Sequence, residues 1–370
     1  MIHLIDCSFD FLPEYTTPEQ VFKKRWPGYG YVEFINTLLC LTVIQHINYE
    51  GKIMSGNVWY SFFKGRKNFF NIPFGTLIFI KKRKPDVVIT QGLIFPVQVI
   101  LLRLILGSRC RIITQHHGEI PYPGIKKFFQ KIADRCTDAY LFTASGNMKP
   151  WIECKIIRNP IKGIELLESS TYFKRREKED AKSMVGMSGN DNFLWVGRLQ
   201  MNKDPFTVLN AFEKYLSINS LAKLYMIYGD GVLINQIEAL IDKNDLLKKR
   251  VILVGDTPHD DLTYWYSAAD FFISGSRREG SGYALLEAMA CGCIPVITDI
   301  PSFRKITADG QFGFLYEAGN VNALFSLLQS LKIINRREFS DSVADYFEKE
   351  LSFQCIAEKM FAICRNLVAK

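Results

Sequence analysis

The sequence has no pattern that would hold a disulfide framework or a metal ion. Its nine cysteines are an odd number, none of them forms a CxxC pair, and only Cys291 and Cys293 are closely spaced. Disulfide-stabilised domains and zinc sites need such paired spacings. No His, Asp and Glu cluster has metal-ligand spacing, and no DxD element stands at a strand end. We therefore expect a protein of a reducing compartment that uses neither a metal ion nor another cofactor.

Long hydrophobic runs are also absent. The longest apolar stretch, residues 92–107, is interrupted by Gln98 and Arg103, and it is shorter than the roughly 20 residues that a membrane-spanning helix requires. The N-terminal sequence MIHLIDCSFDF lacks the basic segment and the apolar run of an export signal. The sequence therefore predicts a cytoplasmic protein without a membrane span.

Signatures of two other function classes are missing. No GxGxxG follows a first strand, which argues against an NAD-dependent oxidoreductase, and no helix-turn-helix, finger or RNA-binding motif supports binding to nucleic acid. Charge is instead distributed unevenly. Residues 1–185 hold 27 Lys and Arg against 16 Asp and Glu, whereas the whole chain has a net charge of +8. This excess indicates either an anionic partner, with a phosphate-rich surface, nucleic acid and acidic lipid as the candidates, or a basic surface that is only solvated.

The chain of 370 residues is long enough for two domains. Short β-rich runs alternate with helical patterns, which is typical of parallel sheets covered by helices. Helical patterns include residues 31–46 and 96–106, and a polar segment at 168–192 marks the best boundary. We expect an α/β fold with two Rossmann-like domains facing a central cleft, at residues 1–167 and 168–345. Residues 346–370 should form a helix that packs on the first domain. Strands are expected at 2–6, 86–90, 111–117 and 139–144, and in the second half at 193–197, 224–229, 251–255, 271–276 and 294–298.

Ligands of such folds gather where strands end and helices begin. Residues 276–298 follow an expected strand, pass through Gly280, Ser281 and Gly282, and open a helix. A helix N-terminus behind glycines offers unpaired N–H groups to a phosphate. Glu279 and Glu287 flank the turn, and carboxylates accept hydrogen bonds from sugar hydroxyls. The alternative is that Glu279 caps a helix and Glu287 forms a surface ion pair.

A second strand end carries cations. Gly197, Arg198 and Lys203 follow the first strand of the second half. Two cations beside a helix start form a clamp for a diphosphate, in which each charge-assisted hydrogen bond contributes roughly 1.5–3 kcal/mol. Together with the turn that bears the two glutamates, this spacing predicts a diphosphate site in the same domain as carboxylates that suit sugar hydroxyls.

These motifs resemble the nucleotide-sugar-binding domain of retaining glycosyltransferases of family 4, which have the GT-B fold. The resemblance covers about residues 192–332 in consistent order. It rests on VGRL with a downstream lysine, YGDG at 228–231, EGSGYALLE at 279–287, ACGCIPVIT at 290–298 and GFLYEAGN at 313–320. In the first half it is thinner, with KPDVVIT at 84–90, QHHGE at 115–119 and IIRNPI at 156–161.

The resemblance implies a role for each matching residue. Arg198 and Lys203, after Gly197, would hold the diphosphate and stabilise the leaving nucleotide. Glu287 would bind the ribose, Glu279 the sugar hydroxyls, and the backbone of 280–282 the phosphate and sugar.

Two assignments in the first half remain open. His117, which precedes a glycine, would lie beside the reacting sugar, although the adjacent His116 is an alternative and a strand-end histidine can also satisfy a core hydrogen bond. Gly28 and Gly30 would stand in the phosphate loop, although Tyr29 separates them. In the second half, Ser281 and Gly275 occupy positions where the family commonly has an aromatic residue and a proline.

We therefore expect a retaining, metal-independent glycosyltransferase. It would move a hexose-type sugar from a nucleotide-diphosphate sugar to a saccharide or lipid-linked saccharide in surface polysaccharide or glycolipid synthesis. Peripheral association with an anionic membrane follows if the acceptor resides there. The alternative is a non-catalytic protein that binds sugar nucleotides and has kept the fold.

Overall fold

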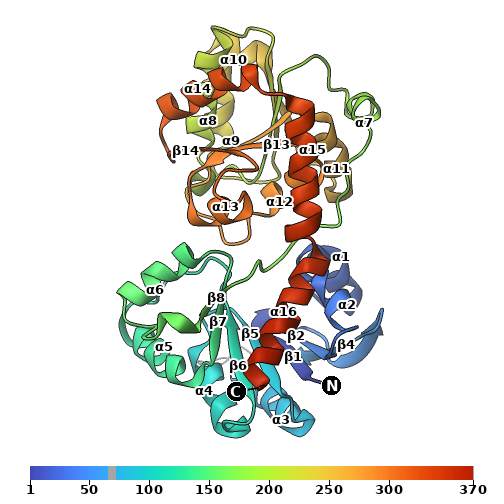
Figure 1. Cartoon of the computed structure of the whole chain (residues 1–370), viewed down its shortest axis with the longest axis vertical. Helices are drawn as coiled ribbons and strands as arrows, with labels where there is room; N and C mark the ends of the chain where they lie inside the picture. Colours follow the sequence, from blue (N-terminus) through green and yellow to red (C-terminus); the bar gives the residue numbers. More distant parts are fainter. Residues whose placement is uncertain (66–71, 370) are drawn as a thin grey trace. The chain divides into compact units, whose positions relative to one another are not determined.

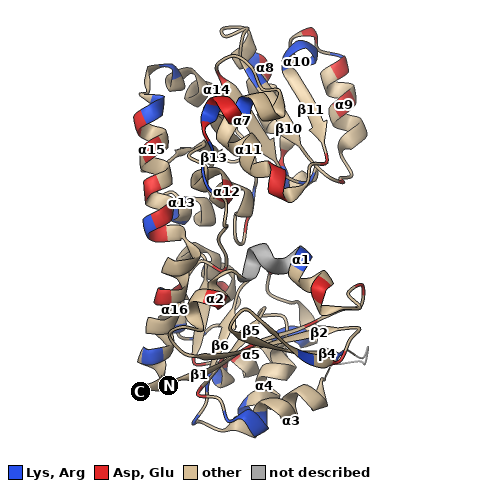
Figure 2. Cartoon of the chain, turned by 90° about the vertical axis from the view of Figure 1, so that its right-hand side faces the viewer, with Lys and Arg blue, Asp and Glu red and all other residues tan. Residues whose placement is uncertain are grey.

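The computed structural model describes residues 1–65 and 72–369, which form two compact units (Figure 1). The N-terminal unit comprises Met1–Ser170 and Ser352–Lys370, and the C-terminal unit comprises Thr171–Leu351. Each unit contains a mainly parallel sheet with helices, which confirms the expected α/β fold with two parallel-sheet domains. The boundaries expected at 168 and 346 stand at 171 and 352 in the structure. Basic and acidic residues occur on both units (Figure 2).

The sheet of the N-terminal unit has the strand order β3-β4-β2-β1-β5-β6-β7-β8. Neighbouring strands run parallel, except that β3 and β4 are antiparallel. The strands are β1 (His3–Leu12), β2 (Cys40–Ile47), β3 (Gly51–Ser55), β4 (Val58–Lys64), β5 (Val87–Gln91), β6 (Arg111–Gln115), β7 (Ala139–Phe142) and β8 (Gly163–Glu165).

The prediction of a helix over residues 31–46 is wrong. The chain forms only the short α2 (Tyr31–Ile35) and then enters β2, which pairs with β1 and β4 on its two sides. Every residue of β2 after Cys40 is buried. A strand that is covered on both faces has a continuous apolar run, which periodicity cannot distinguish from a buried helix.

Helices α3, α4 and α5 share one hydrophobic core with the sheet. Leu77, Val99 and Ala133, one from each helix, lie in the same buried cluster as Val88 of β5 and Ile112 of β6. This cluster fixes the three helices on one face of the sheet. The helices of this unit are α1 (Pro18–Tyr29), α2, α3 (Phe74–Arg83), α4 (Pro96–Leu106), α5 (Gly124–Cys136), α6 (Lys149–Glu153) and α16 (Phe353–Val368).

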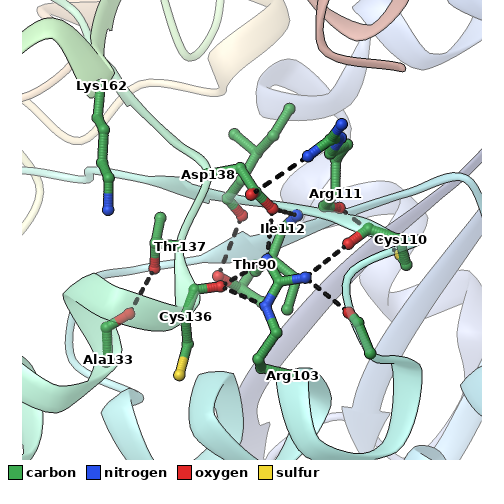
Figure 3. Close-up of polar contacts among 12 residues, drawn as sticks. Thr90, Arg103, Cys110, Arg111, Ile112, Ala133, Cys136, Thr137, Asp138 and Lys162 are labelled. Carbon is green, nitrogen blue, oxygen red and sulfur yellow. Dashed lines mark hydrogen bonds and ion pairs between the residues drawn. The ribbon is translucent and has the colours of Figure 1, made fainter. Parts of the chain in front are cut away.

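Arg103 of α4 ties together the amino ends of β6 and β7 (Figure 3). Its guanidinium donates to the backbone oxygens of Cys110 and Cys136, at 2.9 and 2.8 Å, and to Asp138 Oδ2 at 2.5 Å. Asp138 also accepts from the backbone N–H of Ile112 at 2.7 Å. One cation and one carboxylate thus bond polar backbone groups at the amino ends of β6 and β7. This network lies at the edge of the sheet opposite the carboxyl ends of the strands.

The expected phosphate loop at Gly28 and Gly30 is helical instead. Gly28 lies within α1, and Gly30 ends this helix with φ −59° and ψ −27°. A Cβ atom on Gly30 would lie 2.4 Å from Cε2 of Phe353 in α16. The structure therefore gives Gly30 a packing role, because the absence of a side chain lets α16 approach.

The C-terminal unit has a fully parallel sheet in the order β11-β10-β9-β12-β13-β14. All five strands expected in this half are present. The chain builds outward from β9 through β10 to β11 and then returns to the other side of β9 with β12. The strands are β9 (Asn192–Val196), β10 (Lys223–Ile227), β11 (Val251–Gly255), β12 (Phe271–Ser274), β13 (Ile294–Thr298) and β14 (Phe314–Tyr316).

Helices connect these strands around an aromatic core. Phe193 of β9 stacks on Phe271 of β12, with ring centroids 5.0 Å apart, and meets Phe212 of α8 edge-on. Throughout the described ranges of the chain, no helix is both long and apolar enough to span a membrane. The helices are α7 (Lys178–Val185), α8 (Pro205–Leu216), α9 (Ile234–Asp242), α10 (Asp245–Arg250), α11 (Leu262–Ala268), α12 (Tyr283–Ala290), α13 (Pro301–Ile306), α14 (Val321–Ser330) and α15 (Arg336–Tyr346).

Candidate functional site

The candidate site of the C-terminal unit lies where its strand order reverses. Strands β9 and β12 are neighbours, but their connections leave in opposite directions along the sheet. The loop after β9 covers residues 197–204, and the loop after β12 covers residues 275–282. Parallel sheets bind ligands at the carboxyl ends of strands beside such a reversal. The topology thus brings the two predicted motifs to one place.

Polar contacts join these two loops. The backbone N–H of Arg277 donates to the oxygen of Asn202 at 2.8 Å, and Asn202 Nδ2 donates to the oxygen of Arg278 at 2.9 Å. Arg277 also donates through Nη2 to Asp204 Oδ2 at 2.6 Å. Asp204 in turn caps α8 by accepting from the N–H of Thr207 at 3.2 Å. These hydrogen bonds therefore hold the two loops in place against each other.

Gly275 allows this close approach. A Cβ atom at this position would lie 2.5 Å from the backbone oxygen of Asp204, a distance that real Cβ atoms do not reach. The glycine that stands here in place of the family's common proline is explained by the packing of the two loops.

Lys203 and Glu279, both predicted site residues, meet across the loops. Lys203 Nζ lies 2.5 Å from Glu279 Oε1, and their side chains are 28% and 14% exposed. Arg198 is exposed, and no residue in the described part of the chain pairs with its guanidinium. Gly197 directly follows β9, and a Cβ atom added to it would lie 3.9 Å from Cδ of Lys203. The site thus offers one paired cation, one unpaired cation and one carboxylate.

The glycines after Glu279 prepare the start of α12. Gly282 is the N-cap and has φ +66°, a left-handed conformation that favours glycine. Ser281 is buried, and Gly280 is half-buried. Gly282 has no side chain that could cap the first turn of α12, and the N-terminus of a helix carries a partial positive charge that favours an anion.

Glu287 is a buried carboxylate with two side-chain partners. Its Oε1 lies 2.7 Å from His259 Nε2, and its Oε2 accepts from the hydroxyl of Tyr266 at 3.0 Å. The alternative of a surface ion pair is wrong, since only 5% of Glu287 is exposed. The hydrogen bond to Glu287 raises the pKa of His259, although burial opposes the shift. His259 was not predicted; its position shortly after β11, at the same sheet edge, was the available signal.

A second polar cluster surrounds His117 in the N-terminal unit. His117 Nδ1 lies 2.5 Å from Glu168 Oε2, and its Nε2 lies 2.7 Å from Gln91 Oε1. Its side chain is 39% exposed. His116 is instead buried, bonded to the backbone oxygen of Glu119 at 3.0 Å. Of the two adjacent histidines, His117 is therefore the one that can meet a ligand.

The partners of His117 favour its protonated form. Gln91 Nε2 donates to Asp6 Oδ1 at 2.7 Å, which leaves Gln91 Oε1 as the acceptor that faces the imidazole. Both ring nitrogens therefore face acceptors, and only an imidazolium can donate to both. Burial lowers the pKa of His117, but the hydrogen bond and charge of Glu168, together with the charges of Glu119 and Asp6, outweigh burial, so the pKa is raised. Asp6, Gln91 and Glu168 were not predicted, because they lie on separate segments that only the fold brings together.

Comparisons with known proteins find a family model that matches part of the second half. Residues 177–346 match the family described as glycosyl transferases group 1. The chain is 27% identical, over 71% of its length and 72% of the relative's, to N-acetylgalactosamine-N,N'-diacetylbacillosaminyl-diphospho-undecaprenol 4-alpha-N-acetylgalactosaminyltransferase of Campylobacter jejuni. It is 24% identical, over 67% of each chain, to UDP-Gal:alpha-D-GlcNAc-diphosphoundecaprenol alpha-1,3-galactosyltransferase of Escherichia coli.

A third relative matches over a shorter span. It is the alpha-monoglucosyldiacylglycerol synthase of Streptococcus pneumoniae, 28% identical over 49% of this chain, and the match spans 42% of that protein's length.

Solved structures share the fold across the chain. Sucrose-phosphate synthase from Thermosynechococcus elongatus matches with a TM-score of 0.73 and 15% identity, over 100% of both chains. HepE from Anabaena in complex with UDP matches with a TM-score of 0.73 and 12% identity, over 99% of this chain and 100% of the other. At such identities the likeness shows the fold alone, that of GT-B glycosyltransferases.

Proposed function

We propose that this chain, whose residues 177–346 match the family described as glycosyl transferases group 1, transfers a hexose-type sugar from a nucleotide-diphosphate sugar to a saccharide or lipid-linked saccharide. Transfer retains the anomeric configuration and needs no metal ion. The observation that carries the proposal is the pairing of Lys203 with Glu279 across two loops, of which one also holds Arg198 and the other leads into α12 at Gly282.

These groups match the chemistry of the donor. Departure of a nucleoside diphosphate builds negative charge on phosphate oxygens, and fixed cations lower the barrier by stabilising that charge as it forms. Arg198 and Lys203 supply the two cations, and the N–H groups at the start of α12 add a partial positive charge. Glu279, which faces Lys203, is an acceptor for sugar hydroxyls. Two cations and a helix terminus take the place of a metal ion.

The acceptor is proposed from the relatives. Two of them are named for saccharides linked to diphosphoundecaprenol, a membrane lipid. We assign this chain an acceptor of the same class in surface polysaccharide or glycolipid synthesis, handled at the inner face of the cell membrane. His117, in the N-terminal unit, has the role at the reacting sugar that the resemblance implies. Both of its ring nitrogens face Glu168 and Gln91, so a substrate would share or displace one of these partners, and the protonated ring supplies a positive charge at that point.

Substitution of the two cations tests the proposal. Arg198→Ala and Lys203→Ala should each weaken binding of UDP or GDP by about 10- to 100-fold, because one charge-assisted hydrogen bond contributes about 1.5–3 kcal/mol. Calorimetric titration measures the affinity, and release of nucleoside diphosphate in the presence of a diphosphoundecaprenol saccharide measures transfer. Lys248→Ala, which removes an exposed cation that pairs with Asp242, is the control. Unchanged affinity in both site variants, with folding intact, would refute the clamp.

A non-catalytic protein that binds sugar nucleotides is the second candidate. It would show the same loss of affinity in the Arg198 and Lys203 variants. It would release no nucleoside diphosphate from UDP, GDP or ADP sugars with any acceptor, so turnover by the parent chain decides between the two.

A further inference from the structure

The two cations of the candidate site differ in their partners. Arg198 is exposed, and none of the residues that the structure describes pairs with its guanidinium. Lys203 Nζ instead lies 2.5 Å from Glu279 Oε1, and the two side chains are 28% and 14% exposed. A carboxylate therefore lies directly against one of the two cations that the proposed function assigns to the diphosphate.

The backbone around Glu279 keeps this carboxylate beside Lys203. The backbone oxygen of Glu279 accepts from Ser302 Oγ at 2.5 Å, and the backbone oxygen of Arg278 accepts from Asn202 Nδ2 at 2.9 Å. In the described ranges of the chain, the carboxylate itself has one partner, which is Lys203. Loss of this partner would leave a largely buried charge without a hydrogen bond, which is unfavourable.

A nucleotide sugar and a free nucleoside diphosphate present different groups to such a carboxylate. The β-phosphate of the nucleotide sugar is esterified, whereas that of the nucleoside diphosphate is terminal. A terminal phosphate has a second pKa of about 6 and so carries about one additional negative charge at neutral pH. The sugar also supplies hydroxyl groups that donate hydrogen bonds, which an ionised phosphate does not.

Glu279 is close enough to Lys203 to sense this difference in charge. A bond from an ammonium to a phosphate oxygen measures about 2.7–2.9 Å, so a phosphate oxygen on Lys203 Nζ would lie at most about 5.4 Å from Glu279 Oε1. Like charges at this distance repel each other, and they do so more strongly in a partly buried site than in bulk water. If Lys203 instead leaves Glu279 for the phosphate, the carboxylate loses its partner. Both arrangements disfavour a free nucleoside diphosphate.

We propose that Glu279 makes the site prefer the intact nucleotide sugar to the nucleoside diphosphate that transfer leaves behind. With the donor, sugar hydroxyls donate to the carboxylate while Lys203 meets the esterified diphosphate. After transfer those hydroxyls are gone and the β-phosphate carries its additional charge, so Glu279 opposes the product and promotes its release. This inference rests on the proposed function and gives Glu279 a role in specificity beyond its contact with the sugar.

Calorimetric titration of the full chain, without an acceptor, tests the preference. The probes are UDP with UDP-galactose, and GDP with GDP-mannose, because each pair shares its base. Glu279→Gln keeps the size of the side chain and removes its charge. It should tighten binding of the nucleoside diphosphate by about fivefold or more, which corresponds to about 1 kcal/mol, the upper range for an ion pair that no longer competes. It should not tighten binding of the nucleotide sugar, because sugar hydroxyls bond more strongly to a carboxylate than to an amide.

Two controls separate this effect from a general change in charge. Glu179→Gln removes the carboxylate partner of Lys182, 3.0 Å away in the same unit, and changes the net charge equally. It should leave both affinities unchanged. UMP, which lacks a β-phosphate, should bind the parent chain and Glu279→Gln alike. Equal weakening of UDP and UDP-galactose in Glu279→Gln would show that the carboxylate only holds the loops together, and it would overturn the proposal.

Arg198→Ala distinguishes failure of this proposal from failure of the proposed function. If this variant weakens binding of the nucleoside diphosphate while Glu279→Gln leaves the ratio of the two affinities unchanged, the diphosphate clamp stands and only the preference assigned to Glu279 is overturned. If the parent chain binds neither UDP nor GDP, nor either nucleotide sugar, the proposed function fails and the preference fails with it.

Discussion

His259 Nε2 lies 2.7 Å from Oε1 of Glu287, so the second glutamate of the EGSGYALLE motif is already bonded to a histidine that the motif does not contain. Tyr266 occupies the other carboxylate oxygen. If Glu287 binds the ribose hydroxyls of a donor, as the resemblance implies, those hydroxyls must share or displace these partners. The protonation state of His259 should therefore affect how well Glu287 binds the ribose of a donor.

Glu287→Gln should lower the pKa of His259. The hydrogen bond to Glu287 is the largest influence that raises this pKa, and Asp260 has a smaller influence in the same direction. Titration of the histidine ring protons by NMR measures the change, and Asp260→Asn is the control that should shift the midpoint less. Equal shifts in both variants would show that the pair with Glu287 does not set the pKa.

The same pair predicts the sign of a pH effect on stability. A histidine whose pKa is raised in the folded chain contributes stability that is fully present below its unfolded pKa, about 6.5, and that is lost as the pH rises through the folded pKa. The parent chain should therefore exceed Glu287→Gln in stability most at acidic pH. A difference that grew toward alkaline pH would contradict the raised pKa of His259.

His117 provides the second prediction. His117→Asn should lower the transfer rate by about 100-fold or more, since removal of one group that stabilises charge in a transition state has effects of that size. Glu168→Gln should lower the pKa of His117, because the charge of Glu168 raises it. The alkaline limb of the rate profile should then move to lower pH, whereas a residue with only a structural role would reduce the rate without moving the limb. His116→Asn is the control and should not reproduce the shift of the alkaline limb, because His116 is buried and has a lowered pKa.

The third prediction concerns the junction between the two loops. Gly275→Ala should destabilise the C-terminal unit by about 1–3 kcal/mol, because the new methyl group must displace backbone at Asp204. Gly75→Ala is the matched control. Gly75 is helical in α3 and has no atom within 4 Å of the added Cβ, so this change should instead stabilise by about 0.5–1 kcal/mol. Hydrogen exchange resolves the two units, and faster exchange confined to residues 197–204 and 275–282 is expected for Gly275→Ala alone.

The sequence predicted the C-terminal unit better than the N-terminal one for a physical reason. In the C-terminal unit, strand ends, glycines and charged side chains follow one another along short stretches, so local spacing singled out the turn at 280–282, Lys203 and Glu279, although not the ion pair between the last two. The cluster around His117 combines residues from β1, β5 and the segment after β8, and no local spacing reports such a junction. The phosphate loop expected at Gly30 was not found for a related reason. The missing side chain of Gly30 makes room for Phe353, which is more than 300 residues away in the sequence.

The last prediction tests that distant contact. Gly30→Ala adds a methyl group 2.4 Å from Cε2 of Phe353, and with φ −59° it imposes no backbone strain, so any cost arises from the collision with α16. We expect a loss of about 1–3 kcal/mol in the free energy of unfolding of the N-terminal unit. Phe353→Leu removes the ring atoms that collide, so the double variant should be less destabilised than the sum of the two single variants. Urea denaturation followed by tryptophan fluorescence, with Trp151 as a reporter buried in this unit, measures the three variants. Strict additivity would mean that Gly30 and Phe353 do not touch, and that α16 is held to the unit by other contacts.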